Sequence, residues 1–222
     1  MSNISFNVLT PTIPIERRDK MSHSYGFKQL ERDIGVILQE TSDHKAIIDK
    51  VKPLLEQLLQ NKNLIPAPYR TPRPDKYAQY LLYKPDDEAF SVIAFVWGPG
   101  QVAPVHDHLV WGLVGLYEGA VVEKRYRRED RGQSAEPRYA IREVGEVTAR
   151  RGDISYVYPP DHDIHGVSNP FGEPAITLHI YGADIGKQPR HIHDVATGNY
   201  RDIITRHDNE APVYSSHTAA SS

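Results

Sequence analysis

The sequence contains no cysteine and no long hydrophobic run. Without cysteine the chain cannot form disulfides, bind zinc through thiolates or use a cysteine nucleophile. No stretch approaches the roughly 18 apolar residues that a membrane-crossing helix requires, and residues 1–22 contain no run of signal-peptide length. We therefore expect a cytoplasmic protein with no membrane partner, whose site chemistry depends on histidine, tyrosine, arginine, glutamine and hydroxyl groups.

The charge distribution argues against a nucleic-acid partner. The chain has 222 residues, 39% of them hydrophobic, and a formal net charge of −3, which suits one well-buried domain. The densest charged run, residues 123–131, is broken by acids, and we interpret it as a solvated hairpin end.

The N-terminal third of the sequence has helical periodicity. Residues 1–24 are polar and are expected to form a flexible arm. Apolar residues then recur at helical spacing in two runs: Phe27, Leu30, Ile34, Ile37 and Leu38, and later Ile47, Ile48, Val51, Leu54, Leu55, Leu58 and Leu59. Asp43 is placed to cap the second helix, and Pro53 predicts a kink or a restart within it. We expect residues 25–74 to be a helical segment that packs on the rest of the chain.

The pattern beyond this segment changes to short strands separated by glycine turns. The predicted strands are 79–83, 90–97, 113–117, 120–126, 154–158 and 175–181. Turns at 98–100, 118–119 and 152–153 favour a small antiparallel barrel over alternating βαβ units. The fold is thus predicted to be mainly β, with the barrel and its site at 75–210 and a disordered tail at 211–222.

His106 and His108 are the first indication of a metal site. Side chains two apart on an extended strand point to the same face, so both imidazoles can reach one ion while Asp107 points away. Two surface histidines on a strand would look the same, and imidazole suits zinc, copper, iron and nickel alike. A second pair, His191 and His193, follows the last predicted barrel strand, and we interpret it as structural or surface.

The flanks of these histidines resemble a known superfamily. Residues 100–108 and 152–169 are similar to the two sequence motifs of the cupins, which fold as a small double-stranded β-helix, or jelly-roll, barrel with a metal in its mouth. The resemblance implies His165 as the third ligand, because the spacing of its rival His162 to Asn169 does not match the motif. The glutamate ligand usual in the first cupin motif has no counterpart in residues 110–113. The implied ligand set is three histidines.

Thr177, His179 and Tyr181 alternate along one predicted strand and therefore share a face. They could form a hydrogen-bonded relay inside the barrel, or simply the half-buried polar face of a strand. Together with the three histidines, they resemble the thiol dioxygenases of the cysteine dioxygenase family over about residues 75–190. In that family three histidines bind non-haem Fe(II) beside a Ser-His-Tyr relay, and Thr177 here replaces the serine.

Three further positions resemble a bacterial subgroup of that family. Gln79 stands where animal-type cysteine dioxygenases carry a carboxylate-binding arginine, and Gly112 is nearest to the place of their crosslinking cysteine. In both departures the sequence resembles the bacterial 3-mercaptopropionate dioxygenases. In those enzymes an arginine nine residues after the relay tyrosine binds the substrate carboxylate, which implies this role for Arg190.

The resemblance implies an Fe(II)-dependent thiol dioxygenase that converts a small mercaptocarboxylate, first of all 3-mercaptopropionate, with O2 to its sulfinate. Cysteine dioxygenase and mercaptosuccinate dioxygenase are the enzymatic alternatives, and a non-catalytic small-ligand-binding cupin is the alternative from another class. The lack of an arginine at or near position 79 argues against both other dioxygenases. The sequence leaves a homo-oligomer open.

Overall fold

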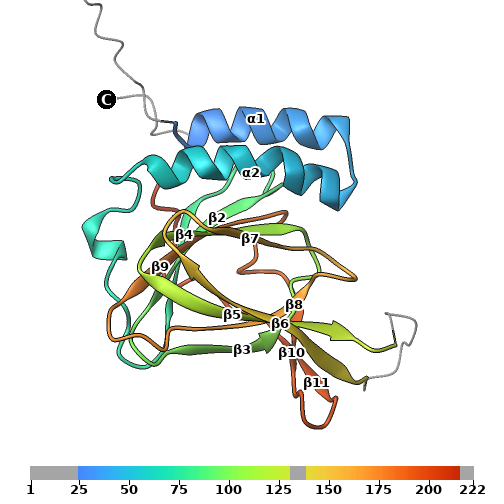
Figure 1. The fold of residues 1–222 in the computed structure, drawn as a ribbon. Coiled ribbons are helices and arrows are strands. Elements are labelled where there is room, and N and C mark those ends of the chain that lie inside the picture. Colours follow the sequence, from blue (N-terminus) through green and yellow to red (C-terminus); the bar gives the residue numbers. More distant parts are fainter. Residues whose placement is uncertain (1–24, 131–138, 216–222) are drawn as a thin grey trace, which may run out of the picture.

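The computed structural model describes residues 25–130 and 139–215. These residues form a mainly β fold with two N-terminal helices and two antiparallel sheets (Figure 1). The predicted arm at 1–24 and residues 216–222 of the predicted tail lie outside the described residues.

The two helices lie side by side on one face of the barrel (Figure 1). They are α1 (Phe27–Glu40) and α2 (His44–Gln60), and the Asp43 carboxylate caps α2 by accepting a hydrogen bond from the Ala46 N–H at 2.8 Å. The restart considered at Pro53 does not occur, because buried residues on both sides of the proline hold α2 against the sheet. None of the helices in the described residues is long and apolar enough to cross a membrane.

Close packing of α2 on the barrel depends on a glycine. A Cβ atom on Gly115 would lie 2.8 Å from Cδ1 of Leu59, so only glycine lets the helix approach this strand so closely.

The described residues form eleven strands in two sheets. They are β1 (Ala78–Tyr83), β2 (Ser91–Trp97), β3 (Val102–His106), β4 (Gly112–Glu118), β5 (Ala120–Arg128), β6 (Ile141–Arg150), β7 (Ile154–Val157), β8 (Ile164–Ser168), β9 (Ala175–Tyr181), β10 (Arg190–His193) and β11 (Tyr200–Ile203). One sheet has the order β1-β2-β9-β4-β7 and the other β11-β10-β3-β8-β5-β6. The cores of these sheets, β2-β9-β4-β7 and β3-β8-β5-β6, have the strand order of a jelly roll, which confirms the predicted double-stranded β-helix.

The sheet beneath the helices is buried on both faces. Every residue of β2 and β9 is buried, and alternate residues belong to different cores. Ile176, Leu178 and Ile180 pack toward the helices, whereas Ala175 and Tyr181 belong to the cluster inside the barrel. Because side chains alternate along a strand, Thr177 and His179 also face the barrel interior.

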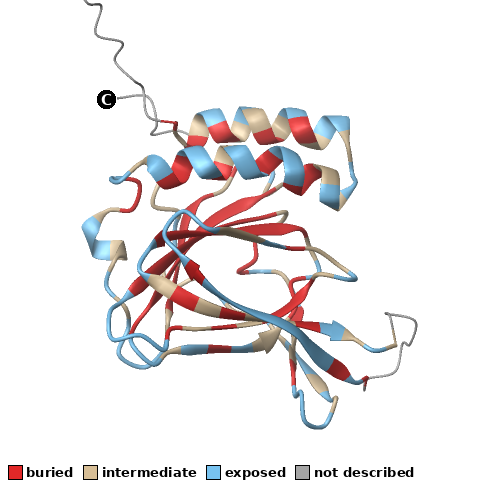
Figure 2. Cartoon of the chain, viewed as in Figure 1, coloured by how far each residue is buried: buried red, intermediate tan, exposed pale blue. Residues whose placement is uncertain are grey.

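The other sheet is exposed on its outer side, and its strands were harder to predict. β6 shows almost no alternation, since eight of its ten residues are exposed, as Figure 2 shows along its length. The prediction therefore missed it, along with the short strands β8, β10 and β11. Pairing with β5, not a hydrophobic face, holds β6 in place.

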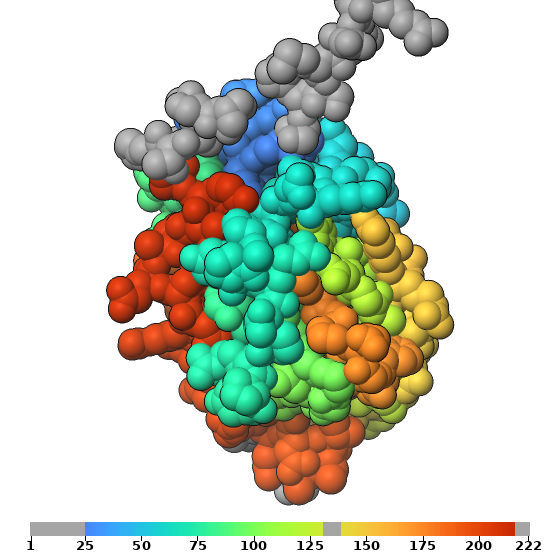
Figure 3. All heavy atoms as spheres, turned by 90° about the vertical axis from the view of Figure 1, so that its left-hand side faces the viewer, coloured from blue at the N-terminus to red at the C-terminus, as the bar shows by residue number. Residues whose placement is uncertain are grey.

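The C-terminal residues lie against the edge strand β1. The Val213 and Tyr214 N–H groups donate to the carbonyl oxygens of Leu81 and Leu82 at 3.1 and 2.9 Å. Figure 3 shows this segment in red beside the connector between α2 and β1, drawn in teal. The predicted disordered tail therefore begins too early: backbone hydrogen bonds hold residues 211–215, and the Tyr214 side chain adds a hydrogen bond to the Leu64 carbonyl oxygen at 2.9 Å and a ring contact with Phe27.

Candidate metal and active site

Three histidine side chains meet where strands β3 and β8 pair. His106 ends β3 and lies directly opposite His165 of β8, and His108 follows two residues after β3. The ring centres lie 4.8 to 4.9 Å apart, and one nitrogen of each ring lies within 4.8 Å of the others. The strand pairing thus joins the two histidine motifs into one candidate metal site.

Each of these imidazoles is oriented through its Nδ1 atom. The acceptors are the Pro104 carbonyl oxygen for His106 (2.8 Å), Oε1 of Glu123 for His165 (3.0 Å), and the carbonyl and carboxylate oxygens of Asp163 for His108 (3.2 and 3.3 Å). These oxygens accept, so each Nδ1 carries the hydrogen and each Nε2 keeps its lone pair. Nε2 of His108 is buried and has no partner among the described residues, as a ligand atom awaiting its ion would be.

The electrostatics favour neutral imidazoles. Burial lowers the pKa of His106 and of His108 well below the usual value, and the charges that neighbouring imidazoles would carry lower it further. Burial alone would raise the pKa of Glu123, but the hydrogen bond and charge of His165 lower it to about 2. The site therefore combines two neutral imidazoles, those of His106 and His108, with an ionised carboxylate behind His165, and such a carboxylate raises the basicity of a metal ligand.

The three polar residues of β9 form a continuous hydrogen-bonded row inside the barrel. His179 lies 2.7 Å from the Thr177 hydroxyl through Nε2 and 2.7 Å from the Tyr181 hydroxyl through Nδ1. The Trp97 indole N–H donates to the Thr177 oxygen at 2.9 Å and so anchors the far end. Burial lowers the pKa of His179 and raises that of Tyr181, so the imidazole is neutral and the phenol keeps its proton.

The Tyr181 ring lies against the histidine triad. It stacks on His108 with ring centres 5.2 Å apart and planes inclined by 21°. A Cβ atom on Gly112 would lie 2.5 Å from Cδ1 of this ring, so the glycine makes room for the phenol. Position 112 is therefore the point of β4 that touches the tyrosine.

A narrow cavity of about 20 Å³ lies between His106 and His165 of the triad, His179 and Tyr181 of the relay, and Arg190. Its walls are Tyr77, Phe95, Trp97, Ala103, His106, His165, Val167, His179, Tyr181 and Arg190. Arg190 begins β10, is 5% exposed, and its buried Nε atom has no partner among the described residues. The void holds about one water, so a larger ligand can enter only if a wall residue moves.

Gln79 lies beside this cavity with its amide orientation fixed. It is 1% exposed and shares the inner face of β1 with Leu81, but it does not line the cavity itself. Its Nε2 donates to the Thr205 carbonyl oxygen at 3.1 Å and lies 3.2 Å from Nδ1 of His207. Oε1 is buried without a partner. Gln79 therefore offers a hydrogen-bond acceptor, not the donor that a carboxylate would need.

Asp107 points away from the triad, as expected, and binds the second histidine pair. Its carboxylate lies 2.7 Å from Nδ1 of His191 and 3.1 Å from Nε2 of His193, and it accepts from the His191 N–H at 2.7 Å. Burial opposes ionisation, but these bonds lower the pKa of Asp107 to about 2. These bonds attach β10, which begins with Arg190, to the segment that carries His106 and His108.

Sequence reasoning missed two carboxylates that orient the triad. Glu123 was assigned to a solvated hairpin end, which is wrong: its side chain is 3% exposed and points into the barrel. Val121, two residues earlier on the same strand, is buried, and this alternation could have revealed the orientation of Glu123. Asp163 is also buried, and the only sequence signal for its role was its position two residues before His165.

His162, the sequence rival of His165, does not join the triad. Its ring lies against Tyr158 and Tyr156, with ring centres 4.9 and 5.8 Å apart, in a separate pocket. The structure therefore groups His165 and not His162 with His106 and His108.

Comparisons with known proteins find only distant likeness. No family model matches the chain. Among similar solved structures, the protein TT1209 from Thermus thermophilus is 22% identical over 51% of this chain and 89% of its own, with a TM-score of 0.38. A double-stranded β-helix protein from Klebsiella pneumoniae is 18% identical over 52% and 84%, also at 0.38. Hydroquinone 1,2-dioxygenase PnpCD is 11% identical over 49% and 66%, again at 0.38. Likeness this distant assigns neither a family nor an activity to this chain.

Proposed function

We propose that this protein is a non-haem Fe(II)-dependent dioxygenase of small thiol carboxylates, with 3-mercaptopropionate as the first candidate substrate. One observation carries the proposal: two histidines of the triad, His106 and His165, a protonated phenol and an arginine with an unpaired N–H line the walls of one cavity. The buried, unpaired Nε2 of His108 fits an ion held by His106, His108 and His165. When bound, Fe(II) supplies the open coordination positions at which a thiol and O2 combine into a sulfinate.

The residues of the chain would bind and orient the substrate. Arg190 would hold the carboxylate through charge-assisted hydrogen bonds, which are stronger than neutral ones. Trp97 donates to Thr177, which leaves the threonine hydroxyl free to donate to Nε2 of His179. Nδ1–H of His179 then donates to the Tyr181 oxygen, and the phenol proton is directed into the cavity. Arg190 and Tyr181 thus act on opposite parts of one small ligand.

Cysteine is the second candidate because of Gln79. The unpaired Oε1 of Gln79 could accept a hydrogen bond from a substrate ammonium group. Against it, an ammonium close to the Arg190 guanidinium would weaken binding by charge repulsion. For mercaptosuccinate, the cavity wall has no second arginine among the described residues to hold another carboxylate. A ligand-binding barrel without catalysis would not need the row from Thr177 to Tyr181.

Iron analysis and an oxygen electrode test the proposal together. The purified protein should bind about one iron per chain, and alanine at His106, His108 or His165 should remove most of it. The iron-loaded protein should consume O2 with 3-mercaptopropionate, form the sulfinate, and show a higher kcat/KM than with cysteine. Binding of 3-mercaptopropionate without O2 consumption would make the protein a ligand-binding barrel. Loss of iron on His162→Ala but not on His165→Ala would refute the ligand set.

A further inference from the structure

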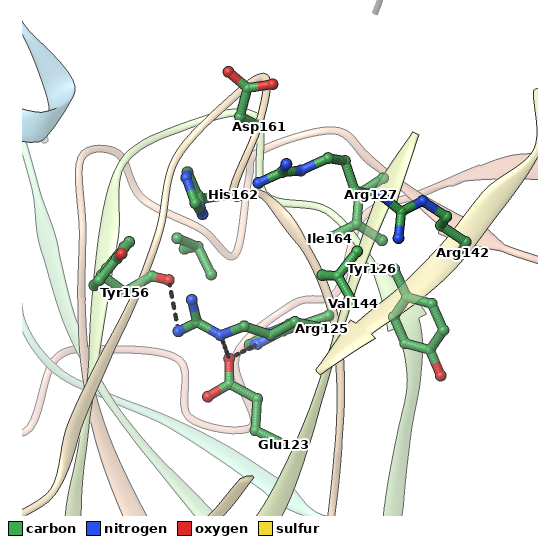
Figure 4. Close-up of a pocket in the computed structure, with 12 residues that line it drawn as sticks. Glu123, Arg125, Tyr126, Arg127, Arg142, Val144, Tyr156, Asp161, His162 and Ile164 are labelled. Carbon is green, nitrogen blue, oxygen red and sulfur yellow. Dashed lines mark hydrogen bonds and ion pairs between the residues drawn. The ribbon is translucent and has the colours of Figure 1, made fainter. Parts of the chain in front are cut away.

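A second pocket, of about 430 Å³, opens where the edges of the two sheets meet, between β7 on one side and β5 with β6 on the other. Figure 4 shows Arg125, Arg127 and Arg142 extending from β5 and β6 toward the side of the pocket that carries Tyr156 and His162. Three guanidinium groups therefore share one concave space.

Two of these arginines form no ion pair among the described residues, although one carboxylate besides Glu123, that of Asp161, also lines the pocket. Arg127 and Arg142 are directly opposite each other in the β5–β6 pairing, where like charges repel. Neither forms an ion pair with any residue that the structure describes. The neighbouring Lys124, by contrast, pairs with Glu143 and Glu146 at 3.2 and 3.1 Å. Glutamates of β6 thus neutralise Lys124, whereas Arg127 and Arg142 have no such ion pair among the described residues.

The third arginine forms a fixed inner wall. Arg125 lies 3.2 Å from the Glu123 carboxylate, donates to the Tyr156 carbonyl oxygen at 3.2 Å, and stacks over the Tyr156 ring at 5.0 Å. The positive field reaches His162: burial lowers its pKa, the charges of Arg127 and Arg125 lower it further, and the Asp161 carboxylate opposes this shift without cancelling it. These groups are therefore close enough in space to act on one ligand.

We propose that this pocket binds a small dianionic ligand, such as a phosphate monoester or a dicarboxylate, between Arg125, Arg127 and Arg142. Arginine can bind such oxyanions with two parallel N–H bonds, and an anion here would relieve the repulsion between Arg127 and Arg142. The pocket is distinct from the catalytic cavity, since the two share only His165 among their lining residues. An extended polyanion is disfavoured, because Glu143 and Glu146 lie on the same ribbon.

Calorimetry with the full chain tests the proposal. The probes are inorganic phosphate, succinate and acetate at matched ionic strength, and the variants are Arg127→Gln/Arg142→Gln and, as a matched control, Lys124→Gln. We expect phosphate or succinate to bind at least tenfold more tightly than acetate. This binding should weaken at least tenfold in the double variant and stay unchanged in the control. The tighter of the two probes identifies the ligand as a phosphate or a dicarboxylate.

Thermal melting provides an independent readout, because a ligand of the native state raises the melting temperature. The preferred dianion should stabilise the unmodified protein and the Lys124→Gln control, but not the double variant. The proposal would be overturned if acetate bound as tightly as the dianion, or if the Lys124→Gln control lost dianion binding to the same extent as the double variant. It would also be overturned if the double variant still bound the dianion. Such binding would place the anion elsewhere, for example at Arg190.

Discussion

At the scale of single residues, the triad depends on what lies behind each imidazole. Glu123 accepts the hydrogen bond from Nδ1 of His165, so its charge strengthens Nε2 as a donor to a metal. Glu123→Gln should therefore weaken iron binding by roughly tenfold or more, while the three histidines stay in place. Competition with a chelator measures the affinity. The control is Glu146→Gln, because Glu146 is an exposed glutamate on the adjacent strand β6. An equal loss of iron affinity in this control would refute the role of Glu123.

Tyr181 touches the triad through its ring and the relay through its oxygen. Tyr181→Phe removes only the hydroxyl, so iron should stay bound while sulfinate formation slows or becomes uncoupled from O2 use. Parallel assays of O2 consumed and sulfinate formed test this. An unchanged rate with full coupling would reduce the row on β9 to ordinary barrel packing.

Arg190 and Gln79 should differ in what they contribute to binding. Arg190→Ala removes a charge-assisted contact and should raise KM for 3-mercaptopropionate by about tenfold or more, with little change in iron content. Gln79→Ala should cost less, because its amide N–H groups already serve Thr205 and His207. Steady-state oxygen uptake distinguishes the two variants. An unchanged KM in Arg190→Ala would refute the substrate assignment but not the dioxygenase proposal.

At the scale of the elements, the approach of β4 to β9 sets the position of the phenol. Gly112→Ala would place Cβ 2.5 Å from the Tyr181 ring, so the ring must move away from His108. We expect a loss of activity of at least tenfold with iron retained. Gly145→Ala on β6 is the matched control, because a Cβ there meets nothing within 4 Å. Full activity of Gly112→Ala would show that the ring position does not matter.

The elements also show what the sequence could reveal. The strand 175–181 was predicted with its observed bounds, because its apolar residues and turns are unambiguous. β6 was missed because eight of its ten residues are exposed and its apolar residues do not alternate, and residues 211–215 were missed because their partners lie far away in the sequence. The pair His106 and His108 and the three residues of β9 were recognisable because their spacing is that of side chains on one face of a strand, although His108 lies two residues beyond β3. His165 was recognised from the resemblance to the cupin motifs. Glu123 and Asp107 acquire their partners only through pairing of distant strands.

At the scale of the whole molecule, burial of neutral histidines predicts how stability depends on pH. The folded pKa values of His106, His108 and His179 lie below the usual 6.5, so acid favours the unfolded chain once the pH falls below that value. Each fully buried histidine lowers the free energy of unfolding by up to about 1.4 kcal/mol for each pH unit below the usual pKa. Burial raises the pKa of Asp163 to about 6, and its protonation partly offsets this loss between about pH 6 and 4.

The metal-free protein should therefore melt at a lower temperature at pH 5.5 than at pH 7.5. Chelator-treated samples followed by circular dichroism test this. His179→Gln cannot take up the proton and should show a shallower decline. A melting temperature that is constant or rises on acidification would contradict the prediction.

The attachment of β10 to β3 has a consequence for substrate length. Ile192 pairs directly with His106, and Asp107 fastens the same two strands, so the backbone fixes the span from Arg190 to the triad. A strand advances about 3.3 Å per residue and must slip by two residues to keep its side chains on the same face. The smallest permitted change in this span, about 6.6 Å, is far larger than one methylene group. For the proposed mercaptocarboxylate substrate, this pair of strands therefore sets the distance from Arg190 to the triad in coarse steps, and only an exchange of the side chains at its two ends can change that distance by less.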